Sequence, residues 1–519
     1  MQQISIILGI ILHMNLIVGY AENKNKSILV GYTAIESYYD GSLMTEDKCD
    51  GVIYKKMGNT YYKKDLQDNT INVKWYGAKG DGKTDDYAAI QKACSLPHNV
   101  YFPTGNYVIK RGYVKLRGGY QYYGEGKDRS VIIQRTGDAK HGFGGAGCFY
   151  VHSNSQNEYI RNTQIKNLGF DGKVADYGHG QWTHLLAFAG TENTLVDNCG
   201  FYNFRGDGIL VSAGLNYIKV TESLRRNKNI IIRNCFFDGG GTFLNRNGVS
   251  FIDVDGAIID RCDFRRIGHK ELVKSVGAVD VERDIPQSIT KNITVSNCTF
   301  TDISQVNTAG ITIMMRSGKI SEIENFSFSN NTFTNCFWGI FLGNRVNKSN
   351  IKSTHSDNIK INGNTFNYNN VALTLEGKKV EVLNNKFIGK GELKSSVKAG
   401  VIGVLTDCII EENHFNNTGG LGCILIGSLY NTDFINNTFI NARDYSIFFF
   451  NDDTLQKNKI ISNVRFLNNK STHSKIPFFY FGNNSNTKKA IITESVIDNG
   501  NINEGGPMYF GERIRFKRN

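Results

Sequence analysis

Short apolar strands alternate with tight turns along most of the chain from residue 160 onward. A phenylalanine recurs after each apolar strand, usually as Asn-x-x-Phe, at intervals of 21 to 36 residues. Between these markers lies a second strand of the form Gly-apolar-x-apolar, such as GILV at 208 or GITI at 310. Each unit therefore holds two or three short strands and no helix, so it must bury its apolar face against its neighbours. The markers are Phe170, Phe201, Phe237, Phe264, Phe300, Phe333, Phe366, Phe387, Phe415 and Phe439, with a weaker one at Phe466.

This pattern predicts an all-β right-handed parallel β-helix of about eleven coils, stacked roughly 4.8 Å apart. Asparagine at the turns accepts a left-handed backbone and can form side-chain ladders between coils. The chain has ten cysteines, and four of them precede a marker phenylalanine by two residues. Because these four share one phase of the repeat, we expect an interior ladder of small apolar side chains, made of Cys199, Cys235, Cys262 and Cys298.

A short apolar run near the N-terminus, Ile4 to Val18, has the length of a secretory signal, although no Lys or Arg precedes it. A buried N-terminal segment is the alternative. The run is too short for a comfortable membrane span, so we expect a secreted or periplasmic protein with no span after signal removal. The predicted organisation is a signal peptide at 1–21, a small tyrosine-rich segment at 22–69, a β-helix catalytic domain at 70–500 and a basic tail at 501–519.

One helix is predicted, over Asp85 to Cys94, with Thr84 as its N-cap and a strand-like INVKWY before it. The preceding loop, Gly77 to Thr84, matches the phosphate-binding pattern GxxxxGK[ST]. Such a loop belongs to a parallel sheet with alternating helices, and the following sequence predicts almost none. We therefore interpret the loop as a tight turn into a helix that covers the open N-terminal edge of the β-helix.

The segment NVKWYGAKGDGKTDDYAAIQ followed by VYFPTGNYVI resembles the opening of the pectate-lyase-like superfamily, of the rhamnogalacturonase/epimerase type. That group includes polysaccharide depolymerases and phage tailspikes. A later strand is similar to a recurrent GIDIEP variant, with Ala278 in place of its first Gly and Arg283 in place of its Pro. The resemblance implies the fold and a carbohydrate substrate class. It leaves the reaction open, because this fold hosts lyases, hydrolases, epimerases and binders.

Charged residues gather at alternating positions between residues 242 and 284. Asp280 and Glu282 stand two apart on one predicted strand, so both side chains leave the same face, about 7 Å apart along the backbone. Two carboxylates roughly 6.5–9.5 Å apart suit inverting glycoside hydrolysis, one as acid and one as base. Aligning the coils brings further candidates within two or three coils of this pair: Asp207, Arg246, Asn247 and Asp253.

The same alignment predicts two outward rows of side chains on the lateral face of the rod. We expect both rows to meet water, where an extended polymer could lie along the rod. One row holds Leu210, Ser250, Asp280, Thr312 and Phe341, and the other holds Ser212, Ile252, Glu282, Met314 and Gly343.

A lyase would need cations to neutralise a uronate carboxylate and a base for the adjacent proton. His179 and His184 are candidates for the base, Trp182 between them for stacking on a sugar, and Arg246, Arg283 and Arg316 for contacts with an anionic sugar. Each residue also has a plainer interpretation. The acidic pair could be a solvated face, Asp207 and Asp253 could form turns, and the histidines could be ordinary surface residues.

The formal net charge is +12, with the basic residues scattered and no long Lys/Arg run. An acidic polysaccharide fits this charge at least as well as nucleic acid does, and the charge alone does not choose between them. Together with the resemblance, we expect an acidic polysaccharide as partner and no nucleic acid. No CxxC or HExxH motif occurs, so we expect no structural zinc site. We expect no other cofactor, while a calcium ion held by acidic residues stays open. The oligomeric state is open too, a trimer included. The prediction is an exported enzyme that cleaves glycosidic bonds, with hydrolysis slightly favoured. The alternatives are a uronate lyase or epimerase, and a non-catalytic adhesin or tailspike-type binder.

Overall fold

The computed structural model describes most of the chain between residues 30 and 510. The predicted signal peptide and the last nine residues of the predicted tail lie outside the described residues. Those are 30–110, 112–135, 148–153, 158–178, 180, 182–212, 226–240, 246–268, 276–282, 288–315, 323–344, 356–367, 369–389, 405–417, 424–426, 428–442, 445–450, 459–472, 478–482 and 491–510.

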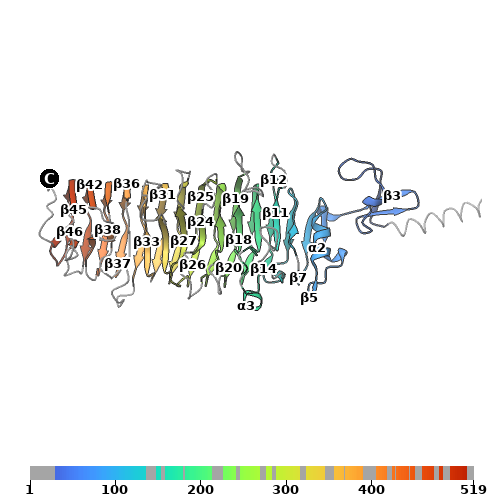
Figure 1. The fold of residues 1–519 in the computed structure, drawn as a ribbon, viewed down its shortest axis with the longest axis horizontal. Helices are drawn as coiled ribbons and strands as arrows, with labels where there is room; N and C mark the ends of the chain where they lie inside the picture. The colour runs from blue at the N-terminus through green and yellow to red at the C-terminus, as the bar shows by residue number, and fades with distance from the viewer. Residues whose placement is uncertain are drawn as a thin grey trace, which may run out of the picture.

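The chain forms a long rod of parallel strands that run across its axis (Figure 1). Successive coils contribute one strand to each wall, so every strand pairs in register with strands of the coils before and after it. The wall that carries the candidate site is a nine-stranded sheet of β8 (Val114–Lys115), β11 (Phe149–His152), β15 (Leu186–Ala189), β18 (Ile209–Ser212), β21 (Val249–Phe251), β24 (Val276–Glu282), β27 (Thr308–Met315), β30 (Trp338–Asn344) and β33 (Val371–Thr374). A four-stranded sheet holds β38 (Ile424–Ile426), β41 (Ile447–Phe450), β44 (Phe479–Gly482) and β47 (Tyr509–Phe510).

The other two walls are longer. A 16-stranded sheet contains β4 (Thr70–Asn72), β6 (Asn99–Phe102), β9 (Gln121–Gly124), β12 (Ile160–Arg161), β13 (Gln164–Lys166), β16 (Thr191–Asp197), β19 (Asn227–Arg233), β22 (Val254–Asp260), β25 (Thr290–Ser296), β28 (Ile323–Ser329), β31 (Ser356–Asn362), β34 (Gly377–Leu383), β36 (Leu405–Glu411), β39 (Leu429–Ile435), β42 (Lys459–Leu467) and β45 (Ile491–Asn499). A 15-stranded sheet contains β5 (Asp81–Asp85), β7 (Gly105–Ile109), β10 (Ser130–Gln134), β14 (Gly169–Asp171), β17 (Gly200–Tyr202), β20 (Phe236–Asp238), β23 (Asp263–Arg265), β26 (Thr299–Thr301), β29 (Thr332–Thr334), β32 (Thr365–Asn367), β35 (Lys386–Ile388), β37 (His414–Asn416), β40 (Thr438–Ile440), β43 (Lys470–Thr472) and β46 (Ile502–Asn503). The predicted right-handed parallel β-helix is confirmed.

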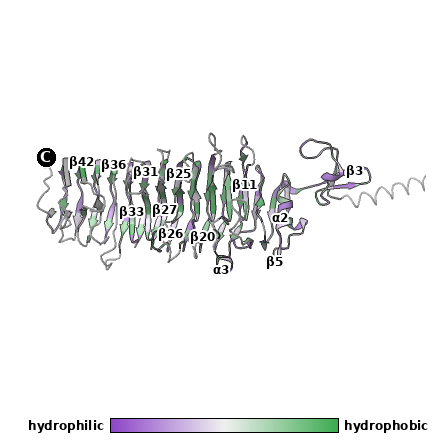
Figure 2. Cartoon of the chain, viewed as in Figure 1, coloured by the Kyte–Doolittle hydropathy of each residue, from purple (hydrophilic) through white to green (hydrophobic). Residues whose placement is uncertain are grey.

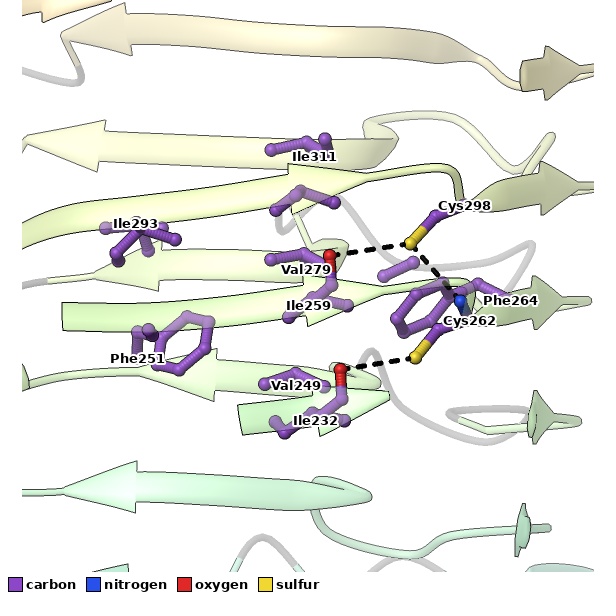
Figure 3. Close-up of a cluster of buried hydrophobic side chains, with 14 of the residues drawn as sticks. Ile232, Val249, Phe251, Ile259, Cys262, Phe264, Val279, Ile293, Cys298 and Ile311 are labelled. Carbon is purple, nitrogen blue, oxygen red and sulfur yellow. Dashed lines mark hydrogen bonds between the residues drawn. The ribbon is translucent and has the colours of Figure 1, made fainter. Parts of the chain in front are cut away.

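The interior is filled by the alternate residues of each strand. On the nine-stranded sheet, Val249, Phe251, Val279 and Ile311 point inward and are fully buried (Figure 3). Because successive side chains of a strand leave opposite faces, the residues between them point outward. This alternation sets the direction of every candidate side chain on that wall.

The marker phenylalanines form one continuous stack through the rod. From Phe170 to Phe439, consecutive rings lie 4.4–5.3 Å apart between centroids and within 10° of parallel. The prediction that Phe466 continues this series is wrong. Phe466 lies in β42 of another wall, where it stacks on Phe434, and the residue that pairs with Phe439 in the next coil is Ser471.

The turns are made as the asparagine content predicts. Asn198, two residues before the short strand β17, and Asn203, directly after it, have φ of 52° and 47°, in the left-handed region that asparagine tolerates. Two residues before each marker phenylalanine, an interior ladder begins with the four cysteines, all buried and free. Cys262 and Cys298 donate weakly to backbone carbonyls of the preceding coil (Figure 3). The predicted cysteine ladder is confirmed.

After Cys298 this interior position becomes asparagine. The backbone N–H of each residue donates to the side-chain oxygen of the next coil, at 2.7–3.0 Å. From Asn331 on, the side-chain amide also donates to that same oxygen. A further N–H of the amide reaches a backbone carbonyl of the preceding coil, as from Asn413 to Val382 at 2.8 Å. The members are Asn331, Asn364, Asn385, Asn413, Asn437, Asn469 and Asn501.

The eight-residue helix α2 (Tyr87–Cys94) lies at the N-terminal end of the rod and buries Ile90, Ala93 and Cys94 there (Figure 1). Two details of the prediction are wrong. Thr84 is not the N-cap, because it belongs to β5 and bonds to Asp81, so the cap position falls to Asp86. The strand predicted over INVKWY (residues 71–76) ends at Asn72, and the 3-10 helix η3 (Val73–Tyr76) follows.

Residues 30–69 add a three-stranded antiparallel sheet beyond this end of the rod (Figure 1). Two short 3-10 helices, η1 (Glu46–Lys48) and η2 (Gln67–Asn69), lie in the same segment. The strands are β1 (Tyr32–Ile35), β2 (Tyr54–Met57) and β3 (Thr60–Lys64). Among the residues that the structure describes, no helix is long and apolar enough to cross a membrane.

Removing one rung of the asparagine ladder should lower stability sharply. Asn413→Ala leaves the N–H and the side-chain amide of Asn385 without their acceptor, in a buried position. We expect a loss of about 3 kcal/mol, because each buried group left unbonded costs roughly 1–3 kcal/mol. Denaturant unfolding followed by circular dichroism measures it. Asn416→Ala in the same coil is the control, because that side chain is only partly buried and lies outside the interior ladder. Equal losses in both variants would contradict a stabilising ladder.

Candidate active site

Three residues stack at the entry to β18, β21 and β24. Asp207, Asn247 and Gly277 hold equivalent places in successive coils, because the N–H of Gly208 bonds to the carbonyl of Asn247 and the N–H of Gly277 to its side chain. Gly208 and Gly248, which follow Asp207 and Asn247, let the coils approach closely. A Cβ on Gly248 would lie 2.6 Å from the carbonyl oxygen of Ala278.

The carboxylate of Asp207 is buried among three donors or cations. The N–H of Asn247 donates to its Oδ1 at 3.0 Å, a guanidinium nitrogen of Arg246 lies 3.9 Å from the same oxygen, and Nδ1 of His184 lies 3.3 Å from Oδ2. Burial raises the pKa of Asp207, but Arg246, His184 and the Asn247 amide together outweigh it and lower the pKa below its ordinary value. Asp207 is therefore a buried carboxylate held in its ionised form.

His184 has two uses for the same nitrogen. Its Nδ1 accepts the backbone N–H of Asp207 at 3.1 Å when the ring proton sits on Nε2. It donates to the carboxylate of Asp207 only when Nδ1 itself carries a proton. A proton on Nδ1 would thus exchange the backbone contact for an ion pair with the carboxylate of Asp207.

Asn247 connects Asp207 to Asp280. Its backbone N–H bonds Asp207, and its side-chain amide donates to Oγ of Ser250 at 2.9 Å and to Oδ2 of Asp280 at 3.0 Å. Its side-chain oxygen accepts the N–H of Gly277 at 3.2 Å. The structure therefore joins five of the predicted residues in one cluster, which we call the Asp207–Asp280 cluster: His184, Asp207, Arg246, Asn247 and Asp280.

Strand pairing confirms the register of the first predicted outward row. Leu210 pairs with Ser250, Ser250 with Asp280, Asp280 with Thr312 and Thr312 with Phe341. The expectation that this row meets water is wrong for most of it. The exposed fraction is 1% for Asp280, 2% for Ser250 and 0% for Thr312. A pairing register fixes which way a side chain points, whereas burial depends on what packs over the strand.

The second row is described in part. Glu282 pairs with Met314 and Met314 with Gly343, and Glu282 is half-buried. On the N-terminal side, Leu210 and Ile252 pack with Ala187 and Tyr150 into a small apolar cluster outside the main core. The polar part of the wall thus begins beyond this apolar cluster. Within it, the side chain of Glu282 is more exposed to solvent than that of Asp280.

Asp253 lies apart from the outward row, at the corner between β21 and β22. Its fully buried carboxylate accepts the N–H of Ile289 at 2.9 Å and lies 3.2 Å from Nε of Arg226. These contacts tie adjacent coils together at a turn. They favour a structural part for Asp253 over the catalytic one that the sequence predicts.

A residue that the sequence did not single out holds the loop before His184. Arg205 is 1% exposed; its guanidinium donates to the carbonyls of Gly178 at 2.7 Å and Tyr177 at 3.1 Å, at the end of the short helix α3 (Val174–Tyr177). Its carbonyl accepts the N–H of Gly180. Arg205 precedes the GDG turn that carries Asp207, so one segment positions both Asp207 and the loop with half-buried Trp182. The sequence gives only a weak sign of this role. An arginine next to Gly-Asp-Gly is expected in an exposed turn, and nothing in the sequence shows that its side chain is buried.

Three predicted site residues, His179, Arg283 and Arg316, lie outside the described residues. Within the part that the structure describes, no group of three or more His, Cys, Asp or Glu side chains could hold a metal ion.

Comparisons with known proteins give a family for part of the chain. Residues 70–299 match the family model "Rhamnogalacturonase A/epimerase, pectate lyase-like". The chain is 25% identical over 274 residues to uncharacterized protein YclG of Bacillus subtilis, covering 47% of this chain and 44% of that protein. It is 43% identical over 68 residues to the preneck appendage protein of Bacillus phage PZA, covering 13% of this chain and 8% of that protein. The chain thus spans less than half the length of these relatives.

Among solved structures, the fold is similar to the A-module of mannuronan C-5 epimerase AlgE6 from Azotobacter vinelandii. The TM-score is 0.49 and the sequence identity 15%, covering 85% of this chain and all of that one.

Neutralising Asp207 should destabilise the protein, and more so at neutral than at acid pH. Since its folded pKa is lowered, ionised Asp207 contributes stability above its unfolded pKa, and that contribution is lost as pH falls through the folded pKa. We expect Asp207→Asn to cost about 3 kcal/mol at pH 7, because it leaves Arg246 without its buried partner. The difference from the wild type should shrink as the pH falls below about 4.

Urea unfolding at several pH values measures this effect. Asp238→Asn is the matched control, because its partner Arg266 is largely exposed and such pairs contribute about 1 kcal/mol or less. A loss in Asp207→Asn that stays constant from neutral to acid pH would contradict an ionised Asp207.

Proposed function

We propose that this pectate-lyase-like right-handed parallel β-helix protein cleaves glycosidic bonds of an acidic polysaccharide, with Asp280 and Glu282 as the acid–base pair. The observation that carries the proposal is the hydrogen-bonded Asp207–Asp280 cluster, which gathers two buried carboxylates, a histidine and an arginine on one wall. Buried charge is costly, and groups of this kind are concentrated at functional sites.

The geometry of β24 suits hydrolysis with inversion. Asp280 and Glu282 pair with Thr312 and Met314 on the same side of one strand, so their backbones stand about 7 Å apart. That is within the roughly 6.5–9.5 Å separation that leaves room for a water between two carboxyl groups. Asp280, fixed as the acceptor of the Asn247 amide, suits the carboxylate that activates this water. Glu282, the more open of the two, suits the acid that protonates the leaving oxygen.

An acidic substrate is favoured by the cation beside the cluster. The Arg246 side chain is 24% exposed while one of its guanidinium nitrogens lies 3.9 Å from Asp207. The exposed part of this planar donor group suits contact with a uronate carboxylate. The chain's net charge of +12 supports the same substrate class.

A uronate lyase or epimerase is the second candidate. The observation that favours it is the proximity of Arg246 and His184 to one carboxylate. Arginine could neutralise the uronate carboxylate while a base removes the proton next to it, the first step of both elimination and epimerisation. A third candidate is a glycan-binding adhesin or phage appendage, favoured by the 68-residue match to a phage preneck appendage protein.

One assay separates these functions. The protein is incubated with polygalacturonate, alginate and other acidic polysaccharides, and the products are followed over time. New reducing ends without unsaturated uronate absorbance identify a hydrolase, and such absorbance identifies a lyase. A changed sugar composition by NMR at constant chain length identifies an epimerase, and binding without any change identifies an adhesin.

Amide substitutions in the pair should abolish cleavage without loss of fold. Asp280→Asn and Glu282→Gln keep side-chain size and remove the acid–base chemistry, so we expect each to lower the cleavage rate about 10²–10⁴-fold. Asp263→Asn is the control, because its carboxylate pairs with Arg265 in a different wall. Thermal unfolding confirms that all three variants fold. Wild-type rates in both amide variants would refute the assignment.

Export is part of the proposal. The apolar run from Ile4 to Val18 has the length of a signal peptide core, and a polysaccharide substrate lies outside the cytoplasm. N-terminal sequencing of protein recovered from the medium or periplasm should begin near Glu22. Recovery of uncleaved protein from the cytoplasm alone would contradict export.

A further inference from the structure

The small N-terminal sheet has two faces of different character. Strand register places Tyr54, Lys63 and Thr33 on one side, because Tyr54 pairs with Lys63 and Lys63 with Thr33. This inner face packs against the rod, where Tyr54 is 1% exposed and belongs to the main core. The outer face of the sheet contributes no side chain to this core.

The outer face combines lysines with aromatic rings. Register puts Tyr32 opposite Lys64, and Tyr62 opposite Lys55. The ammonium groups of Lys55 and Lys64 lie 4.6 and 5.1 Å from the centroid of the Tyr32 ring. Lys64 also lies 5.1 Å from the centroid of Trp75, which belongs to η3 and is 42% exposed. In Figure 2 the strand β3 is coloured as strongly hydrophilic.

In the part of the chain that the structure describes, no carboxylate forms an ion pair with Lys55 or Lys64, whereas Lys56 on the inner side bonds Glu46 at 2.7 Å. Asp65, which follows Lys64 in the chain, accepts the hydroxyl of Thr33 on the inner side of the sheet. Two ammonium groups that converge on one ring repel each other, and an anion bound between them would relieve this repulsion.

We propose that the outer face of the N-terminal sheet binds an anionic polysaccharide chain, at a site separate from the Asp207–Asp280 cluster. Lys55 and Lys64 would bind carboxylate or sulfate groups, while the exposed ring of Trp75 would stack on a sugar. A sugar chain fits better than a nucleic acid, because two lysines beside an exposed indole are few for a regularly charged phosphate backbone.

A second site at the end of the rod has a functional consequence. A polymer held by the N-terminal sheet stays near the lateral wall, which raises its effective concentration there. The sheet would serve in the same way whether the wall cleaves, modifies or only binds the chain. The proposal therefore does not rest on the Asp207–Asp280 cluster being catalytic.

Binding measurements on the full chain test the proposal. All variants carry Asp280→Asn to prevent turnover, and the probes are polygalacturonate, alginate and uncharged dextran. The double variant Lys55→Gln/Lys64→Gln should bind the two polyuronates about tenfold more weakly, the loss of roughly 1.4 kcal/mol expected for two cationic contacts. The matched control, Lys56→Gln/Lys63→Gln, removes the same charge from the inner face of the same sheet and should bind as its parent does.

A second variant separates charge from stacking. Trp75→Ala should weaken polyuronate binding even at high salt, where the contribution of the lysines is screened. Cleavage or modification of short oligosaccharides by the otherwise wild-type lysine variants should be unchanged, so failure of this site is distinguishable from failure of the proposed function. Unchanged polyuronate affinity in both the lysine and Trp75 variants, or equal losses in the inner-face control, would overturn the proposal. Single-stranded DNA bound more tightly than polyuronate, and lost in the same lysine variant, would also overturn it.

Discussion

The registry of one coil on the next is the constraint on which the rest of this structure depends. Backbone pairing alone would tolerate a slip along a strand, but the interior amides do not, because each buried asparagine finds its acceptor only in the matching residue of the next coil. The phenylalanine stack imposes the same alignment through ring contact. With registry fixed, residues far apart in the sequence, such as Leu210 and Phe341, fall into one straight outward row.

The outward row can hold a functional site because its side chains do not pack in the main core. The inward residues Val279 and Val281 supply that packing, so the intervening Asp280 can be polar, and the cost is only that of burying its own side chain. Neighbouring coils offset part of that cost. The amide of Asn247 reaches Asp280 from one coil away, and the backbone and cations around Asp207 keep that carboxylate ionised in a buried position. The candidate site is therefore a property of stacked coils, with no single strand holding enough of it to act alone.

Most of the architecture could be predicted from sequence, because turn asparagines and ring-forming phenylalanines recur at one phase of each coil. Alternation also predicted which residues share the outward row. It could not predict that Asp280 is covered, since cover depends on segments that pack over the strand.

Phe466 fits the marker spacing, yet it lies near the end of the nine-residue strand β42 in another wall. The helix begins late because Asp81 engages Thr84, while the carboxylate of Asp86 is taken by the N–H groups of Lys79 and Gly80. Arg205 shows the same limit, for its role comes from two carbonyls about 27 residues back.

The asparagine ladder has a direction, and this bears on how the rod is made. Donors on one coil meet acceptors on the coil that follows it in sequence, from Cys298 to Asn501. During synthesis on the ribosome, the last completed coil would therefore show its amide donors to water until the next coil emerges and supplies the oxygen. Each newly made coil supplies the acceptor oxygen for the amide donors of the coil before it, and its own amide donors then await the following coil. The half of the rod beyond Cys298 thus carries its own template for growth toward the C-terminus. In the coils under the Asp207–Asp280 cluster, weaker thiol contacts stand at this position, such as the N–H of Cys262 to the sulfur of Cys298 at 3.4 Å.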